Sequence, residues 1–210
     1  MPIYFQVVKG VSATRSGILC IPSVIGLFVS VVLGGSGTSF FGYYAPFMIA
    51  TSILTPIAAG LLTTLSVNTP FILLIVYQAF LGFGTGIGFQ GPQTAASTIF
   101  TPADQPLGIA AIIFAQNFGP ALFVPVAQNI FEGRLVTYLE KYVPGLNGNA
   151  LANMGLLDLK EQVGSGNLGA ALLGYDEAVT KTFFLPLALS CASIIGALGM
   201  EWRTVKSKKS

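Results

Sequence analysis

The sequence predicts an all-α transmembrane protein with about five spanning helices, and the distribution of charge carries most of that prediction. Apolar residues make up 53% of the 210-residue chain and charged residues only 9%, whereas a typical soluble domain is about 25% charged. Residues 16–103 contain no Asp, Glu, Lys or Arg, and two further charge-free runs cover residues 105–131 and 182–200. A soluble protein of this size needs a charged surface, so these runs are expected to cross a bilayer.

Turn signals divide the charge-free runs into pieces of membrane-spanning length, because a bilayer core of about 30 Å is crossed by about 20 helical residues. A small, polar loop is predicted at residues 36–42, directly after Gly34-Gly35, and a short turn at residues 66–70. The predicted spans are residues 17–34, 43–65, 70–90, 106–130 and 182–200.

The fourth span is preceded by a capping pattern. Thr101 is followed three residues later by Asp104, and this spacing is typical of a helix N-terminus. We therefore interpret Asp104 as a helix cap rather than as a proton carrier.

The segment 131–181 is the one substantial polar part of the chain, with six acidic and four basic residues. Apolar residues at near-helical spacing predict a short amphipathic helix at its start, ending before Pro144-Gly145. A second helix is expected to restart near Tyr175 and to lead into the last span. We interpret the segment as an extracellular loop, since five spans place the two ends of the chain on opposite sides and the basic tail favours a cytoplasmic C-terminus.

Composition also excludes several classes of function. A net charge of +2 does not provide the strongly positive surface that binds nucleic acid. The chain has no histidine, and no paired acids or Ser/Lys pair lie within a predicted span, so neither an enzyme nor a metal or cofactor site is predicted. The two cysteines, Cys20 and Cys191, lie in apolar runs and do not indicate a disulfide framework.

The third span is rich in glycine. Gly82/Gly86 and Gly84/Gly88 are both pairs of small residues four apart, a spacing that lets helix backbones approach closely. We interpret both pairs as packing positions, and a face on which helices move against each other is the alternative.

Polar side chains inside the spans are few and are candidates for function, since an amide in hydrocarbon needs a partner or a wet cavity. They are Gln78, Gln90, Gln116 and Asn117, and Phe114 beside the last two could line the same pocket. The alternatives are hydrogen bonds between helices for the amides and lipid or core contacts for the phenylalanine. No acid lies within a predicted span, so the sequence offers no proton carrier embedded in the membrane.

Several segments together resemble the fungal major facilitator superfamily transporters of the fourteen-helix drug:proton antiporter branch. The resemblance rests on residues 2–17, 42–48, 60–64, 86–92, 114–119 and 175–202. It places Gln90, Gln116 and Asn117 on matching motif positions. It implies that the chain contains the last five helices of the C-terminal six-helix bundle and is N-terminally truncated, without the N-terminal bundle that is its expected partner.

The resemblance implies a proton-coupled efflux pump that exports small, largely apolar compounds held between two bundles. It implies as partners the lipid bilayer, a small-molecule substrate and protons, and it places the C-terminus in the cytoplasm. The plasma membrane is the expected location, with the vacuolar membrane as the alternative. A different class stays open at this point, namely a non-transporting integral membrane protein that is either a truncated gene product or a helical scaffold.

Overall fold

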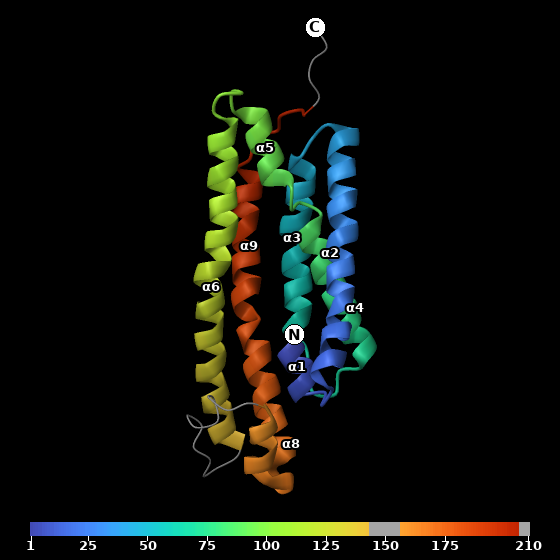
Figure 1. Cartoon of the computed structure of the whole chain (residues 1–210), viewed down its shortest axis with the longest axis vertical. Helices are drawn as coiled ribbons and strands as arrows, with labels where there is room; N and C mark the ends of the chain where they lie inside the picture. Colours follow the sequence, from blue (N-terminus) through green and yellow to red (C-terminus); the bar gives the residue numbers. More distant parts are fainter. Residues whose placement is uncertain (143–155, 206–210) are drawn as a thin grey trace.

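The computed structural model describes residues 1–142 and 156–205, with side chains for 1–142 and 167–205. Its helices run lengthwise in one bundle (Figure 1). They are α1 (Pro2–Val7), α2 (Ala13–Phe41), α3 (Ala45–Leu62), α4 (Phe71–Gly86), α5 (Gly91–Ile99), α6 (Gln105–Tyr142), α8 (Leu156–Thr182) and α9 (Phe184–Leu198).

Five helical segments of the described chain are long and apolar enough to cross a membrane. They are Ala13–Phe41, Ala45–Leu62, Phe71–Ile99, Gln105–Tyr142 and Asn167–Leu198. The predicted fold class, an all-α bundle with about five spanning helices, is confirmed, and the chain is an integral multi-pass membrane protein.

The helices are longer than the predicted spans at several ends. Helix α2 continues through Gly34-Gly35 and the predicted loop 36–42, and it ends only at Gly42, whose φ of 80° is left-handed. Gly34 does not end the helix because it is a packing position, where a Cβ would overlap the carbonyl oxygen of Ile87. The predicted loop 131–181 is helical over 131–142 and again from Leu156, and residues 143–155 lie outside the described part.

The four glycines of α4 and the turn after it make the close contacts that their spacing predicts. Gly82 and Gly86 face α2, where a Cβ on Gly82 would overlap the backbone oxygen of Ser23. Gly84 and Gly88 face α3, whose backbone lies 3.1 Å from a Cβ built on Gly84. Helix α4 thus packs between α2 and α3 at backbone distance, which confirms the packing interpretation.

Helix α6 is attached mainly at its two ends, to α5 at one and to α8 at the other. The helix begins where the capping pattern predicts, directly after Asp104, whose carbonyl accepts from Gly108 N at 3.0 Å and whose Oδ2 accepts from the Thr101 hydroxyl at 2.7 Å. Pro120 and Pro125 lie inside the helix. Because proline has no N–H, Pro120 leaves the carbonyl oxygen of Gln116 without its intrahelical bond.

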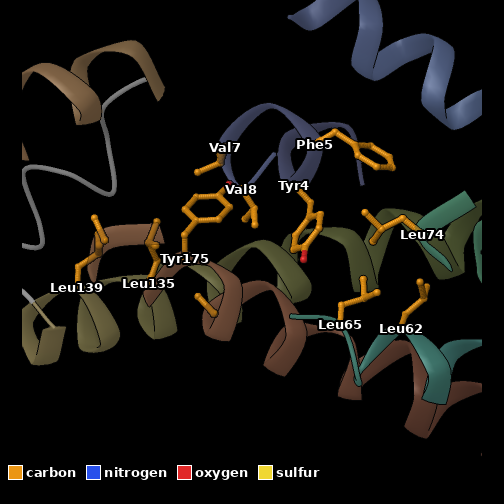
Figure 2. Packing of buried hydrophobic residues seen from close by; sticks show 12 residues of the cluster. Tyr4, Phe5, Val7, Val8, Leu62, Leu65, Leu74, Leu135, Leu139 and Tyr175 are labelled. Atoms are coloured by element: carbon orange, nitrogen blue, oxygen red, sulfur yellow. The ribbon is translucent and has the colours of Figure 1, made fainter. Parts of the chain in front are cut away.

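An apolar cluster closes the end of the bundle at which α1 lies. Figure 2 shows Tyr4 of α1 between Leu62 and Leu65, which belong to α3 and the turn after it, and Tyr175 of α8. Tyr4 is 1% exposed and Tyr175 is 5% exposed. Leu135 and Leu139 of α6 complete the cluster, so that it joins elements from the start, middle and end of the chain.

A polar group lies within this cluster and corrects one expectation from the sequence. The helix expected to restart near Tyr175 already runs from Leu156, and Asp176 within it is only 8% exposed, although the sequence predicts an extracellular loop for the segment 131–181. Its Oδ1 accepts a hydrogen bond of 2.9 Å from the Tyr4 hydroxyl, which also lies 3.1 Å from the Ser66 carbonyl oxygen. The Lys9 ammonium donates to the carbonyls of Val67 and Thr69 at 2.6 and 2.7 Å. A buried acid is therefore present, although no predicted span contains one.

The opposite end of the bundle is closed by the segment that follows α9. Val205 N donates to the Gly42 carbonyl at 2.8 Å, and the Tyr44 hydroxyl donates to the Glu201 carbonyl at 2.6 Å. Burial raises the pKa of this Tyr44 hydroxyl, so it stays a donor. The segment 201–205 therefore lies over the turn between α2 and α3 (Figure 1).

Candidate functional site

The candidate site lies where the span Phe71–Ile99 is interrupted. The chain leaves helical bonding between Gly86 and Gly91, where Phe89 N donates to Gly86 O at 3.1 Å and Gly91 N to Gly88 O at 2.9 Å. Both bonds join residues three apart, which is a tighter turn than the α-helix. Gln90 is the residue before α5, and its side chain is exposed. Interrupted helices of this kind are tolerated at membrane depth where they line a cavity.

Helix α5 carries a polar face. Gln90, Gln93, Thr94, Ser97 and Thr98 follow one another at steps of three and one, which places them on one side of the helix. The opposite side consists of small, buried residues, of which Ala95 packs against Tyr44. The packing of the small side fixes the orientation of the polar side.

The polar face borders a cavity of about 520 Å³ between α2, α5 and α6, which we call the groove. Its polar lining comes from α5 and from Gln90 before it, and its apolar lining comes from α2, α6 and Phe89. The lining residues are Leu27, Val31, Phe89, Gln90, Gln93, Thr94, Ser97 and Ile109. None of these described side chains is ionisable, so the groove offers hydrogen bonds and apolar contact but no charge.

Two amide contacts attach α6 to this face. Gln93 Nε2 donates to Gln116 Oε1 at 3.1 Å, and Gln105 Nε2 donates to the Ser97 carbonyl at 2.8 Å. Gln116 is thus joined to the groove through Gln93. Of the five residues singled out from the sequence, Gln90 lines the groove and Gln116 is hydrogen-bonded to its wall.

The structure does not bring the other three candidates to the groove. Gln78 is 2% exposed, and its Nε2 lies 3.3 Å from the Leu19 carbonyl of α2, which is the interhelical contact left open as the alternative. Asn117 Nδ2 donates to Ile113 O of its own helix at 2.7 Å. Phe114 is 67% exposed and stacks on Phe118 with ring centroids 5.5 Å apart.

Gln93, Thr94 and Ser97 were not predicted as site residues because the third predicted span ends at Gln90. The helical spacing of polar residues beyond Gln90 is the signal that finds them. Together they add an amide and two hydroxyls to the groove, whose lining includes one of the four amides selected from the sequence, Gln90.

Comparison with known proteins identifies relatives of the chain. No family model matches the chain. The MFS-type efflux pump MFS1 of Trichophyton rubrum is 40% identical over 209 residues, which is 100% of this chain and 39% of the relative. The efflux pump roqT of Penicillium rubens is 36% identical over 210 residues, 100% of this chain and 39% of the relative. The chain is homologous to fungal MFS-type efflux pumps.

The chain therefore spans about two fifths of the length of the MFS-type relatives that it matches. The MFS acetylaranotin efflux transporter ataA of Aspergillus terreus gives a similar ratio, since it is 36% identical over 96% of this chain and 45% of its own length. The homology confirms the resemblance to fungal major facilitator transporters. Within the homologous stretch, the groove beside α5 is the candidate binding site.

Proposed function

We propose that the chain is the C-terminal part of a proton-coupled efflux pump and that its groove forms one wall of the site for small, largely apolar compounds. The observation that carries this proposal is the polar face of α5, which borders the groove. This face belongs to the span Phe71–Ile99, which contains no charged residue. Polar groups at membrane depth are costly unless they serve packing or a binding site. The relatives support the same reading, since they are named efflux pumps.

The rest of the pump belongs to this proposal as well. Alternating access needs two bundles that move about a central site, and the chain supplies about two fifths of a relative's length. The second bundle is the proposed partner, and small apolar compounds and protons are the proposed cargo. We place the pump in the plasma membrane with the C-terminus in the cytoplasm, because Arg203 and the three lysines after it follow the last span.

A chimera tests the proposal. The segment of Trichophyton rubrum MFS1 that matches this chain is replaced by the chain itself, and export of an apolar fluorescent dye is measured in yeast cells. We expect Gln93→Leu and Gln116→Leu each to reduce dye export about threefold to tenfold, since each removes a hydrogen-bonding group worth about 0.5–1.5 kcal/mol from the site. Membrane abundance of the variants is expected to be unchanged.

Asn117→Leu is the matched control for these variants, because it removes an amide of the same helix that bonds only within α6 among the described contacts. It is expected to leave export unchanged. Full export by both glutamine variants, or equal loss in all three variants, would contradict a binding role for the groove. The 210-residue chain by itself is expected to export no dye, since it lacks the second bundle.

The proposed topology has its own test. The C-terminal end of α6 and the segment after α9 lie at opposite ends of the bundle (Figure 1). Glu140 belongs to the first and Arg203 to the second, and both are exposed. In a background without Cys20 and Cys191, a cysteine at position 140 is expected to react with an impermeant maleimide from outside sealed cells. A cysteine at position 203 is expected to react only after the membrane is permeabilised. Reaction of both from the same side would refute five membrane crossings.

A further inference from the structure

A second cavity adjoins the groove and has a different lining. It has a volume of about 210 Å³ and lies between α2 and α5, and we call it the polar chamber. Val31, Gln90 and Thr94 line both cavities. The groove has the size of a pocket for a drug-sized ligand, about 300–1,000 Å³, whereas the chamber is large enough only for part of one.

The chamber offers hydrogen bonds from three sides. Thr38 and Ser39 contribute hydroxyls from α2, Thr94 contributes a hydroxyl from α5, and Gln90 contributes its amide. The Thr38 hydroxyl donates to the Gly34 carbonyl at 2.7 Å, so its lone pairs face outward as acceptors. No ionisable side chain is among the described residues that line the chamber.

Gln90 is placed between the two cavities by the packing of α2. Its Oε1 lies 3.3 Å from the position that a Cβ on Gly35 would occupy. The glycine therefore leaves room for the amide against α2. A methyl group at position 35 would meet the end of a flexible side chain rather than backbone, so it would move the amide without separating the helices.

We propose that the polar chamber is a subsite for one hydroxyl or carbonyl group of an uncharged amphipathic compound whose apolar body lies in the groove. This inference rests on the proposed function and names its substrate class. The hydroxyls and the amide of the chamber form hydrogen bonds to water when the chamber is empty. An apolar substituent would displace that water and could not form the lost hydrogen bonds itself. A charged substituent would lose its hydration in a cavity that contains no counter-charge. A neutral group that donates or accepts hydrogen bonds satisfies both conditions.

Equilibrium binding of three matched dyes to the purified chain in lipid nanodiscs tests the subsite. The dyes are 7-(diethylamino)coumarins that carry a hydroxymethyl, a methyl or a trimethylammoniomethyl group at the same ring position, and binding is read by fluorescence anisotropy. We expect the hydroxymethyl dye to bind about threefold to tenfold more tightly than the methyl dye, as one net hydrogen bond predicts. The trimethylammonium dye is expected to bind most weakly.

Two variants locate this preference in the chamber. Thr38→Val removes a chamber hydroxyl at constant shape, and Gly35→Ala moves the Gln90 amide. Both are expected to reduce the preference for the hydroxymethyl dye to below about twofold while the methyl dye binds as before. Thr137→Val and Gly17→Ala are the matched controls, since Thr137 makes the same bond to the carbonyl four residues earlier and a Cβ on Gly17 meets open space. Both controls are expected to keep the preference.

Equal binding of the hydroxymethyl and methyl dyes to the wild-type chain would overturn the inference, and so would tightest binding of the cationic dye. A preference that survives both Thr38→Val and Gly35→Ala would overturn it as well. Absence of binding by all three dyes would also reject the subsite in this chain. The proposed function is decided separately by dye export in the chimera, so failure of the subsite can be distinguished from failure of the proposed function.

Discussion

Replacing Gly82 with alanine is expected to lower the melting temperature of the purified chain in detergent by about 6–12 °C. The added Cβ would overlap the carbonyl oxygen of Ser23 and lie 3.0 Å from the backbone nitrogen of Leu27. These atoms belong to the backbone of α2 and cannot rotate away, so the two helices must separate. Overpacking of this kind costs about 3 kcal/mol at the upper end of its usual range, and each kcal/mol corresponds to about 2–4 °C in a chain of this size.

Gly17→Ala is the control for this prediction, because it makes the same change on α2 at a position where a Cβ meets open space. It is expected to leave the melting temperature unchanged or slightly higher, since alanine favours a helix over glycine by about 1 kcal/mol. Equal melting temperatures of the Gly82→Ala and Gly17→Ala variants would show that α2 and α4 do not pack at backbone distance.

Replacing Asp176 with alanine is expected to cost about 2–3 kcal/mol of stability, measured as a fall in melting temperature of about 4–12 °C. The change removes the nearer and charged one of the two acceptors of the Tyr4 hydroxyl, Asp176 Oδ1 at 2.9 Å, and leaves the Ser66 carbonyl oxygen at 3.1 Å, at a site where Asp176 is 8% exposed. It also removes the negative charge that attracts Lys9. Burial and the bond to Asp176 raise the pKa of the Tyr4 hydroxyl, so the tyrosine remains the donor at neutral pH.

A double-mutant cycle separates this hydrogen bond from general damage to the cluster. Tyr4→Phe, Asp176→Ala and the double variant are compared, and a coupling of about 1–2 kcal/mol between the two positions is expected. Glu140→Ala is the control, since it removes an exposed acid from the same end of the bundle. Additive effects of Tyr4→Phe and Asp176→Ala would mean that the bond contributes nothing of its own.

The parts of the fold that could be predicted depend on residues that are close together in the sequence. The charge-free runs identified the membrane-spanning helices, and the cap of Thr101 and Asp104 located the start of α6. The small-residue pairs of α4 identified its two packing faces, because a spacing of four along a helix repeats on one side.

The features that the sequence did not reveal depend on distant residues. Gly34-Gly35 has the composition of a turn, but α2 continues through it because the interruption after α4 lies against it. Asp176 lies among polar residues in the sequence, which suggests an exposed position. Its burial involves a contact with Tyr4, 172 positions away. Gln93 was missed for a local reason, because the predicted third span ended at Gln90, but its contact with Gln116 of another helix depends on the fold.

The hydrogen bond between Tyr4 and Asp176 has a consequence for the order of biosynthesis. The two residues are 172 positions apart, and a ribosome adds about 5–20 residues per second. Helix α1 therefore waits about 10–35 s after its synthesis before α8, its partner in the end cluster, has been made. During this interval α1 can contact α2, α3 and α4, which are made soon after it, but not α8. The cluster at this end of the bundle is therefore completed only after α8 has been synthesised.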